Sequence, residues 1–168
     1  TTSMCSLALP DYLTGALGQL VGGLIAANDT LLLGRVTYEG FAAAFGSDTS
    51  GNPDAAQMNS FPKVVVSTTL QRADWQNSTL LSGDVAEGIA RLKQQLGGTI
   101  GMSGSGTLVR WLLRQGLVDE LHLLVMPVIV GSGKRLLEGE GDQLPLKLTD
   151  SVTHGNGVLH LTYTPAAT

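Results

Sequence analysis

Three short, predominantly apolar segments constrain the fold of this chain more than any other feature. They span residues 30–33, 63–67 and 99–103, and none alternates apolar and polar side chains as a half-exposed strand does. Such segments are typical of strands buried on both faces, as in parallel sheets covered by helices. Residues 15–28 and 36–45, on either side of the first segment, have apolar side chains at helical spacing. This alternation predicts a parallel sheet with crossover helices.

The remaining elements are expected to complete the sheet with antiparallel strands. Asp84 followed by Glu87 forms a capping box, which predicts the start of a helix, and residues 107–115 predict another. Residues 46–60 are polar and long for a loop, so they form either a flap or partly a helix around 53–59. Further strands are expected at residues 4–9, 120–130 (interrupted or bent at Pro127), 146–152 and 158–163.

We therefore expect one α/β domain over residues 1–168, with a central, mostly parallel sheet, helices on both faces and an antiparallel C-terminal hairpin. Of the 168 residues, 43% are hydrophobic and 14% are charged, which excludes a disordered chain. The net charge of −4 and the lack of a basic segment argue against nucleic-acid binding. No apolar stretch reaches the ~18 residues that cross a bilayer, so we expect no membrane partner.

The single cysteine, Cys5, excludes an internal disulfide framework and a cysteine-based zinc site. Together with a first segment that has no signal-peptide character, it predicts a cytoplasmic protein. His154 and His160 show no metal-ligand spacing with an acidic cluster, so no metal is expected. His122 is interpreted as a structural or interface histidine, with a general acid as the alternative.

The strongest local motif is Gly104-Ser105-Gly106-Thr107, which joins the strand at 99–103 directly to the helix at 107–115. Its glycines allow backbone N–H groups to approach a ligand closely, and the start of a helix attracts negative charge. The motif suits a diphosphate, and a plain strand-to-helix turn is the alternative. It is neither a P-loop nor a GxGxxG motif, so it does not identify the ligand.

Two other predicted strands also end in polar residues. Gly34, Arg35 and Thr37 follow the first buried strand, where an arginine can pair with a phosphate. Ser67 and Thr68 follow the strand that begins at residue 63. Because the carboxyl ends of parallel strands meet at one edge of a sheet, where open α/β sheets bind ligands, we expect these residues to lie together.

The segments LLLGRVTYEGF, VVVSTTL and IGMSGSGTLVRWLLRQGLVDELHLLVMPVIVGSGKRLLEG resemble the dihydrofolate reductase-like superfamily. Within it they are most similar to the reductase domain of riboflavin-biosynthesis enzymes, the C-terminal domain of RibD. The resemblance covers roughly residues 30–163 and implies that NADPH lies along the carboxyl edge of the sheet. It further implies cofactor-phosphate contacts from Gly34, Arg35 and Thr37, a ribose and 2′-phosphate border at Ser67 and Thr68, and a diphosphate turn at Gly104, Ser105, Gly106 and Thr107.

The N-terminal region departs from the family pattern. Family members open with a strand that ends in Ser-Leu-Asp-Gly, and its Asp lies near the substrate. An ungapped match places Pro10 at that position, and a slip of one residue restores an acid as Asp11. The resemblance therefore implies Asp11 as the proton donor, with Tyr12 as a hydroxyl candidate beside it. The extended loop that usually follows this strand is nearly absent.

The function expected is an NADPH-dependent reductase that transfers a hydride to a small conjugated heterocycle of the pteridine or pyrimidine type. One alternative is a non-catalytic nucleotide-binding or accessory protein with a degenerate substrate site. Another is a flavin-binding variant of the same fold, with FMN in place of NADPH. Members of this family type are commonly homodimers, and the apolar segment at residues 121–130 is consistent with such an interface.

Overall fold

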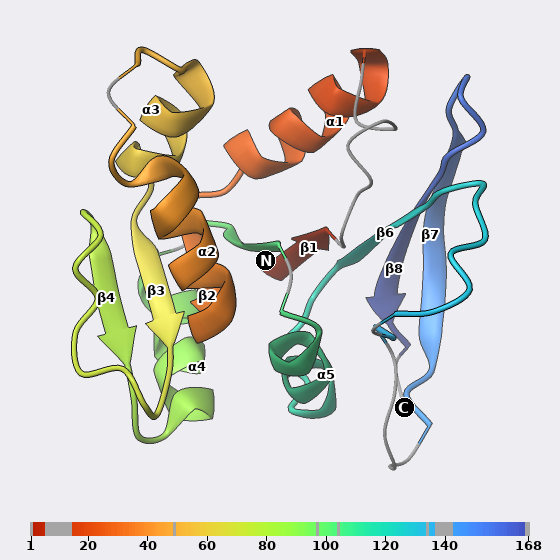
Figure 1. Ribbon diagram of the computed structural model, residues 1–168. Coiled ribbons are helices and arrows are strands. Elements are labelled where there is room, and N and C mark those ends of the chain that lie inside the picture. The colour runs from red at the N-terminus through yellow and green to blue at the C-terminus, as the bar shows by residue number, and fades with distance from the viewer. Residues whose placement is uncertain are drawn as a thin grey trace.

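Two separate sheets form the framework of the protein (Figure 1). The computed structural model describes residues 2–5, 15–48, 50–96, 98–103, 105–133, 135–136 and 143–166. The strands are β1 (Thr2–Cys5), β2 (Thr30–Gly34), β3 (Lys63–Val66), β4 (Ser78–Leu81), β5 (Ile100–Ser103), β6 (Leu121–Val125), β7 (Leu146–Thr153) and β8 (Leu159–Pro165). A five-stranded parallel sheet has the order β1-β5-β2-β3-β4, and an antiparallel sheet has the order β6-β8-β7.

Helices cover both faces of the parallel sheet, as predicted. They are α1 (Gly15–Ala26), α2 (Arg35–Phe45), α3 (Pro53–Ser60), α4 (Val85–Leu96) and α5 (Gly106–Arg114). On one face, Leu32 packs with Ile89 of α4 and Leu112 of α5. On the other face, Leu31 packs with Tyr38 of α2, together with residues of α3. All five residues of β2 are buried, because this strand has helices on both sides.

Two elements, β1 and β4, differ from the sequence-based expectation. Strand β1 begins at Thr2, two residues before the predicted start, and residues 6–9 of the predicted strand lie outside the described residues. Strand β4 was not predicted, because the strand has only four residues and polar turns flank it. The predicted strand at 120–130 is interrupted and not merely bent: β6 ends at Val125, since Pro127 lacks a backbone donor and residues 127–130 are exposed. In the polar segment at 46–60 the helical alternative is confirmed: α3 starts with Pro53 and is capped by the side chain of Asn52.

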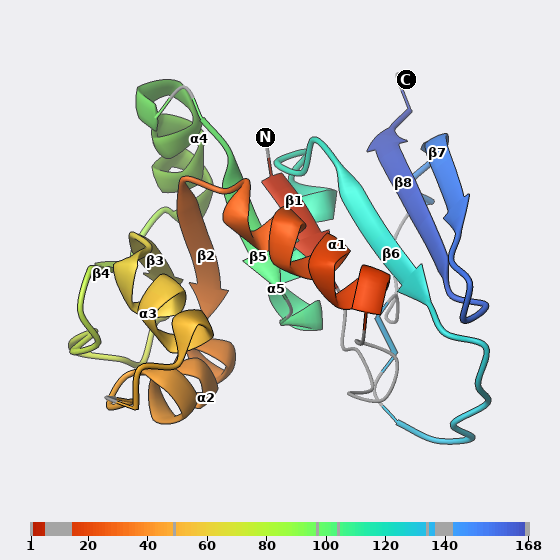
Figure 2. The same ribbon diagram turned by 90° about the horizontal axis from the view of Figure 1, so that it is seen from above.

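The two sheets lie side by side, with β6 next to β1 (Figure 2). Among the described residues no strand pairing joins them. Instead, α1 contributes Leu17 to a cluster with Leu124 of β6 and Val158, so side-chain packing connects the antiparallel sheet to the rest. Within the described ranges, no helix has the length and apolar character needed to cross a membrane.

A buried lysine lies at the amino end of β3. The Lys63 side chain is only 1% exposed. Its ammonium donates to the carbonyl oxygens of Phe61 at 2.7 Å and Gln76 at 3.0 Å, and it lies 4.2 Å from the centroid of the Trp75 ring. Because no carboxylate is among these partners, burial lowers the pKa of Lys63 from 10.5 to about 8.

This lysine predicts a specific pH dependence of stability. The unfolded chain binds the Lys63 proton up to pH 10.5 and the folded chain only to about pH 8. The free energy of unfolding should therefore rise between these values, by up to about 3 kcal/mol. Denaturant unfolding of wild type and Lys63→Met at pH 7.5 and pH 10 measures this rise, since the other titrating groups are common to both. Equal pH dependence in the two proteins would contradict the prediction.

Candidate functional site

The predicted polar strand ends do meet at the carboxyl edge of the parallel sheet. Gly34 is paired with Val66, and Val66 in turn with Leu81, so the residues that follow β2, β3 and β4 leave the sheet side by side. Strand β5 pairs with β2 through Ile100 and Gly101, and Ser105, beyond the carboxyl end of β5, lies against Gly34. The structure thus places Arg35, Ser67, Thr68 and Ser105 along one edge of the sheet.

Strand β5 lies between β1 and β2, and this strand order distinguishes the carboxyl ends of β2 and β5 from the rest of the edge. The chain leaves β2 into α2 on one face of the sheet and leaves β5 into α5 on the other face. Neighbouring parallel strands whose helices go to opposite faces form a topological switch point, which is where open α/β sheets bind ligands. The carboxyl ends of β2 and β5 are therefore the centre of the candidate site.

Close backbone packing joins the two strand ends. A Cβ atom placed on Gly34 would lie 3.1 Å from Cβ and 3.2 Å from Oγ of Ser105. Gly34 has a φ of −78°, so glycine is needed here for space and not for a special backbone angle. Ser105 itself has a φ of 29°, a left-handed conformation that non-glycine residues rarely adopt. This strained turn brings the beginnings of α2 and α5 together.

The first turns of α2 and α5 differ from those of α3 and α4 in a way that favours anions. Asn52 caps α3 and Asp84 caps α4 with a side-chain oxygen. Neither α2 nor α5 has a side-chain cap or an acidic residue in its first turn. Their N–H groups and positive helix ends are left for another acceptor. Two such helix ends in contact suit a diphosphate.

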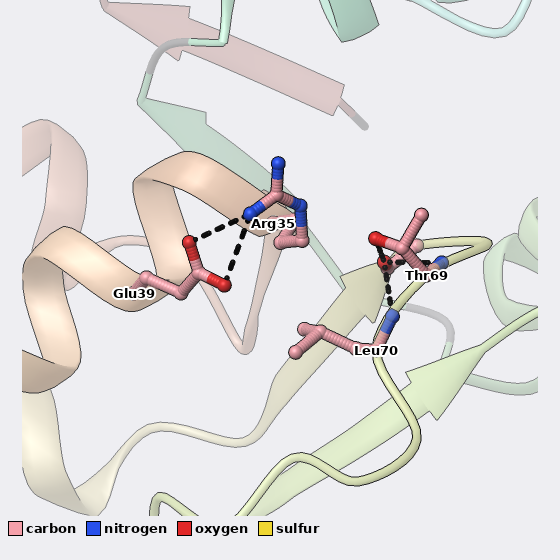
Figure 3. Close-up of polar contacts among 5 residues, drawn as sticks. Arg35, Glu39, Thr69 and Leu70 are labelled. Carbon is pink, nitrogen blue, oxygen red and sulfur yellow. Dashed lines mark hydrogen bonds and ion pairs between the residues drawn. The ribbon is translucent and has the colours of Figure 1, made fainter.

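Arg35 is the cation nearest to the start of α2. Its Nη1 lies 3.0 Å from Oε2 and 3.2 Å from Oε1 of Glu39, one helical turn later (Figure 3). Both side chains are nearly half exposed, so the pair contributes little to stability. The guanidinium can therefore turn from Glu39 to an external phosphate at small cost. Thr37 is half-buried in the same turn of α2.

Ser67 has a hydrogen-bonding role that its sequence position did not indicate. Its buried Oγ accepts hydrogen bonds from the N–H groups of Thr69 at 3.1 Å and Leu70 at 3.0 Å (Figure 3). The hydroxyl therefore shapes the turn after β3. Thr68 is exposed at the tip of this turn and is available to a ligand.

Arg110 is a feature of the site that was not predicted. It reaches from α5 to the segment after β6, where its Nη1 donates at 3.1 Å to the carbonyl oxygens of both Arg135 and Leu136. Its Nη2 lies 3.4 Å from Oγ1 of Thr107. Gly106 at the start of α5 lies close to Arg110 and Leu136. A Cβ atom added to Gly106 would lie 3.5 Å from Nη1 of Arg110 and 3.9 Å from Cδ1 of Leu136.

The turn after β4 also reaches this edge and was missed with its strand. Ser82 and Gly83 follow β4 next to the β3 turn, and Gly83 has a φ of 81°. The signal in the sequence was the pair of leucines before Ser-Gly-Asp and the capping box. Three predicted site residues, Asp11, Tyr12 and Gly104, lie outside the described residues.

The Gly34–Ser105 contact predicts how substitutions at residue 34 affect the site. Gly34→Val adds three side-chain carbons next to Ser105, so the turns after β2 and β5 must separate, which should destabilise the fold by about 1–3 kcal/mol. A double variant with Ser105→Gly removes the opposing side chain and should recover part of this loss. Thermal unfolding of the single and double variants measures the coupling. Strictly additive effects would show that the two residues do not touch.

Comparison with known proteins identifies the family. The model of the RibD C-terminal domain matches residues 12–160. A curated relative from Bacillus subtilis, the protein YyaP, is 28% identical over 140 residues, which cover 80% of this chain and 73% of YyaP.

Two solved structures show the same fold. A protein from Shewanella sp. PV-4 assigned to riboflavin biosynthesis superimposes with a TM-score of 0.71 at 18% identity, covering 99% of each chain. A deaminase/reductase from Thermotoga maritima gives a TM-score of 0.68 at 12% identity, covering 98% of this chain and 56% of that one. With the family match over most of its length, the chain belongs to the RibD C-terminal domain family.

Proposed function

We propose that this protein is an NADPH-dependent reductase of a small conjugated heterocycle. The observation that carries the proposal is the contact between two uncapped helix starts, at Gly34 and Ser105, on the switch point of the sheet. Two further supports are membership of a family of reductase domains and the presence of Arg35 beside the same edge. When bound, NADPH supplies the hydride for the reduction.

The residues present fit a dinucleotide with an additional phosphate. The N–H groups at the starts of α2 and α5 would hold the diphosphate, with Thr37 and Thr107 as hydroxyl donors. Arg35 and the exposed Thr68 would face the 2′-phosphate, since both lie on the edge next to β3. Ser67 would act indirectly, because its hydroxyl orients the turn that presents Thr68.

The substrate class proposed is a pyrimidine or pteridine ring. The Thermotoga maritima protein is named as a reductase of 5-amino-6-(5-phosphoribosylamino)uracil, which is a pyrimidine. Reduction of a C=N bond requires a hydride at carbon and a proton at nitrogen. We assign the proton to Asp11, with Tyr12 as the alternative hydroxyl, because Asp11 is the carboxylate that follows the first strand in the sequence.

The two alternatives make different demands on the same edge. A non-catalytic nucleotide-binding protein would bind NADPH without oxidising it, and an FMN-binding variant would be purified with a yellow chromophore. Arg35 at the start of α2 favours NADPH over FMN. NADPH carries a dianionic 2′-phosphate in addition to its diphosphate, whereas FMN carries a single phosphate. The colour of the purified protein and an assay of NADPH oxidation with a pyrimidine substrate separate the three functions.

A homodimer is part of the proposal. Val128, Ile129 and Val130 after β6 are 44%, 97% and 69% exposed, and Leu148 and Val152 of β7 are 48% and 41% exposed. Exposed apolar side chains in such number are typical of an interface. A second copy of the chain would cover them, as expected for this family type.

Arg35→Ala should weaken NADPH binding about tenfold and leave NADH binding almost unchanged. The reason is the loss of a charge-assisted hydrogen bond of roughly 1.5–3 kcal/mol, reduced here by solvent exposure. Isothermal titration with both nucleotides measures the ratio. Arg72→Ala is the matched control, because Arg72 is also exposed and paired with a neighbouring acid, Asp74. Equal affinity of wild type for the two nucleotides would contradict the phosphate assignment.

Asp11→Asn should lower the turnover number at least a hundredfold while the affinity for NADPH stays within about twofold, because an amide cannot supply the proton. Stopped-flow oxidation of NADPH with a pyrimidine substrate separates the two quantities. Tyr12→Phe serves as the comparison for the alternative donor. Unchanged turnover in Asp11→Asn would assign the proton to another group or to water.

Ile129→Asp should convert the dimer to a monomer, because a carboxylate cannot be buried unpaired at an apolar interface. Analytical ultracentrifugation at micromolar concentration measures the mass, and Asp54→Asn on α3 serves as an exposed control away from the apolar surface. A wild-type protein that sediments as a monomer would contradict the dimer.

A further inference from the structure

We infer that His122 of β6 and His160 of β8 form an acid-sensitive latch. The pair holds the two strands together when both rings are neutral or when the pair carries one added proton, and it loosens them when a second proton binds. This inference is independent of the proposed function. All three histidines of the chain gather here, although they are far apart in sequence: His122 on β6, His160 on β8 and His154 just after β7.

The latch is a direct contact between two buried imidazole rings. Nδ1 of His122 lies 2.9 Å from Nε2 of His160, and the two side chains are 6% and 7% exposed. The strand register pairs His122 with Thr162 and His160 with Leu124, so both rings lie on one face of the antiparallel pair. The hydroxyl of Thr162 lies 3.3 Å from the same Nδ1 atom.

The hydrogen-bond partners limit how many protons the pair can carry. Nε2 of His122 lies 2.7 Å from Oε1 of Glu120 and therefore carries a hydrogen, which it donates to the carboxylate. With both rings neutral, Nδ1 of His122 accepts from Nε2–H of His160. One added proton on Nδ1 reverses this bond, because His160 can change tautomer and accept. A second added proton places an N–H on both facing nitrogens and breaks the bond.

The surroundings make the second proton unfavourable. Burial is the main cause that lowers the pKa of His160, and positive charge on His122 or His154 lowers it further. The His154 ring stacks on His160 with centroids 6.5 Å apart. Asp150 on β7 and Glu120 before β6 act in the opposite direction. Helix α1, which packs against this face through Leu17, has no charged side chain.

The sign of the pH effect follows from this lowered pKa. A histidine in the unfolded chain binds its proton near pH 6.5. Because folded His160 binds it only at lower pH, its contribution to stability is complete above pH 6.5 and is lost as the pH falls through the folded pKa.

The antiparallel sheet can respond as a local unit. No strand pairing connects it to the parallel sheet within the described residues. Seven of the eight residues of β7 are exposed, so this outer strand of the antiparallel sheet buries little surface. Segments with few buried contacts open with less free energy than the whole fold. Acid should therefore loosen β8 from β6 before it affects β2 or β3.

Hydrogen exchange of the wild-type protein at pH 7.5 and pH 5.0 tests the latch. After correction for intrinsic exchange rates, amides of β6 and β8 should lose protection at least tenfold at pH 5.0 relative to those of β2 and β3. His160→Gln should abolish this loss, because its amide can still donate to His122 but does not titrate. Thr162→Val is the matched control: it should lower protection equally at both pH values.

Two results would overturn the latch: unchanged relative protection of wild type at the two pH values, or an equal acid effect in His160→Gln. Imidazole ¹⁵N spectra of wild type keep the inference testable if that variant does not fold. The expected titration shows one of the two facing rings taking up a proton while β8 remains protected. Both rings becoming charged with protection intact would contradict the inference.

Discussion

The position of β5 between β1 and β2 is the constraint on which the candidate site depends. It forces the helices after β2 and β5 onto opposite faces, so the two chain segments separate at the edge and leave two helix starts together. The approach is possible because Gly34 has no side chain and Ser105 adopts a positive φ. The proposed nucleotide site at this edge thus depends on topology first and on individual side chains second.

Sequence patterns predicted the parts of the fold that depend on burial. The apolar residues of β2, β3 and β5 are buried because helices cover both faces, and this pattern is visible in the sequence alone. The cap of α4 was also predicted, since Asp84 accepts from the N–H of Glu87 at 3.0 Å. These features are local or depend only on hydrophobicity.

Features that depend on tertiary contacts were not predicted. Strand β4 has no periodic signal of its own and exists because it pairs with β3. The role of Ser67 depends on the path of the next three residues, which its sequence position does not indicate. Arg110 reaches residues 25 and 26 positions later in the chain, a contact that no motif encodes. The ion pair of Arg35 with Glu39 was not predicted either, although its spacing of four residues on a helix is visible in the sequence.

The buried ammonium of Lys63 has a consequence for chemical modification. The pKa of about 8 belongs to the buried amine, and in that state only 1% of the residue is exposed. Acylating reagents therefore meet Lys147, which is exposed, in the native protein and Lys63 only after the chain around β3 opens. The fold contains its own covalent reporter: the rate at which Lys63 is acylated records how often this part of the core is transiently exposed to solvent.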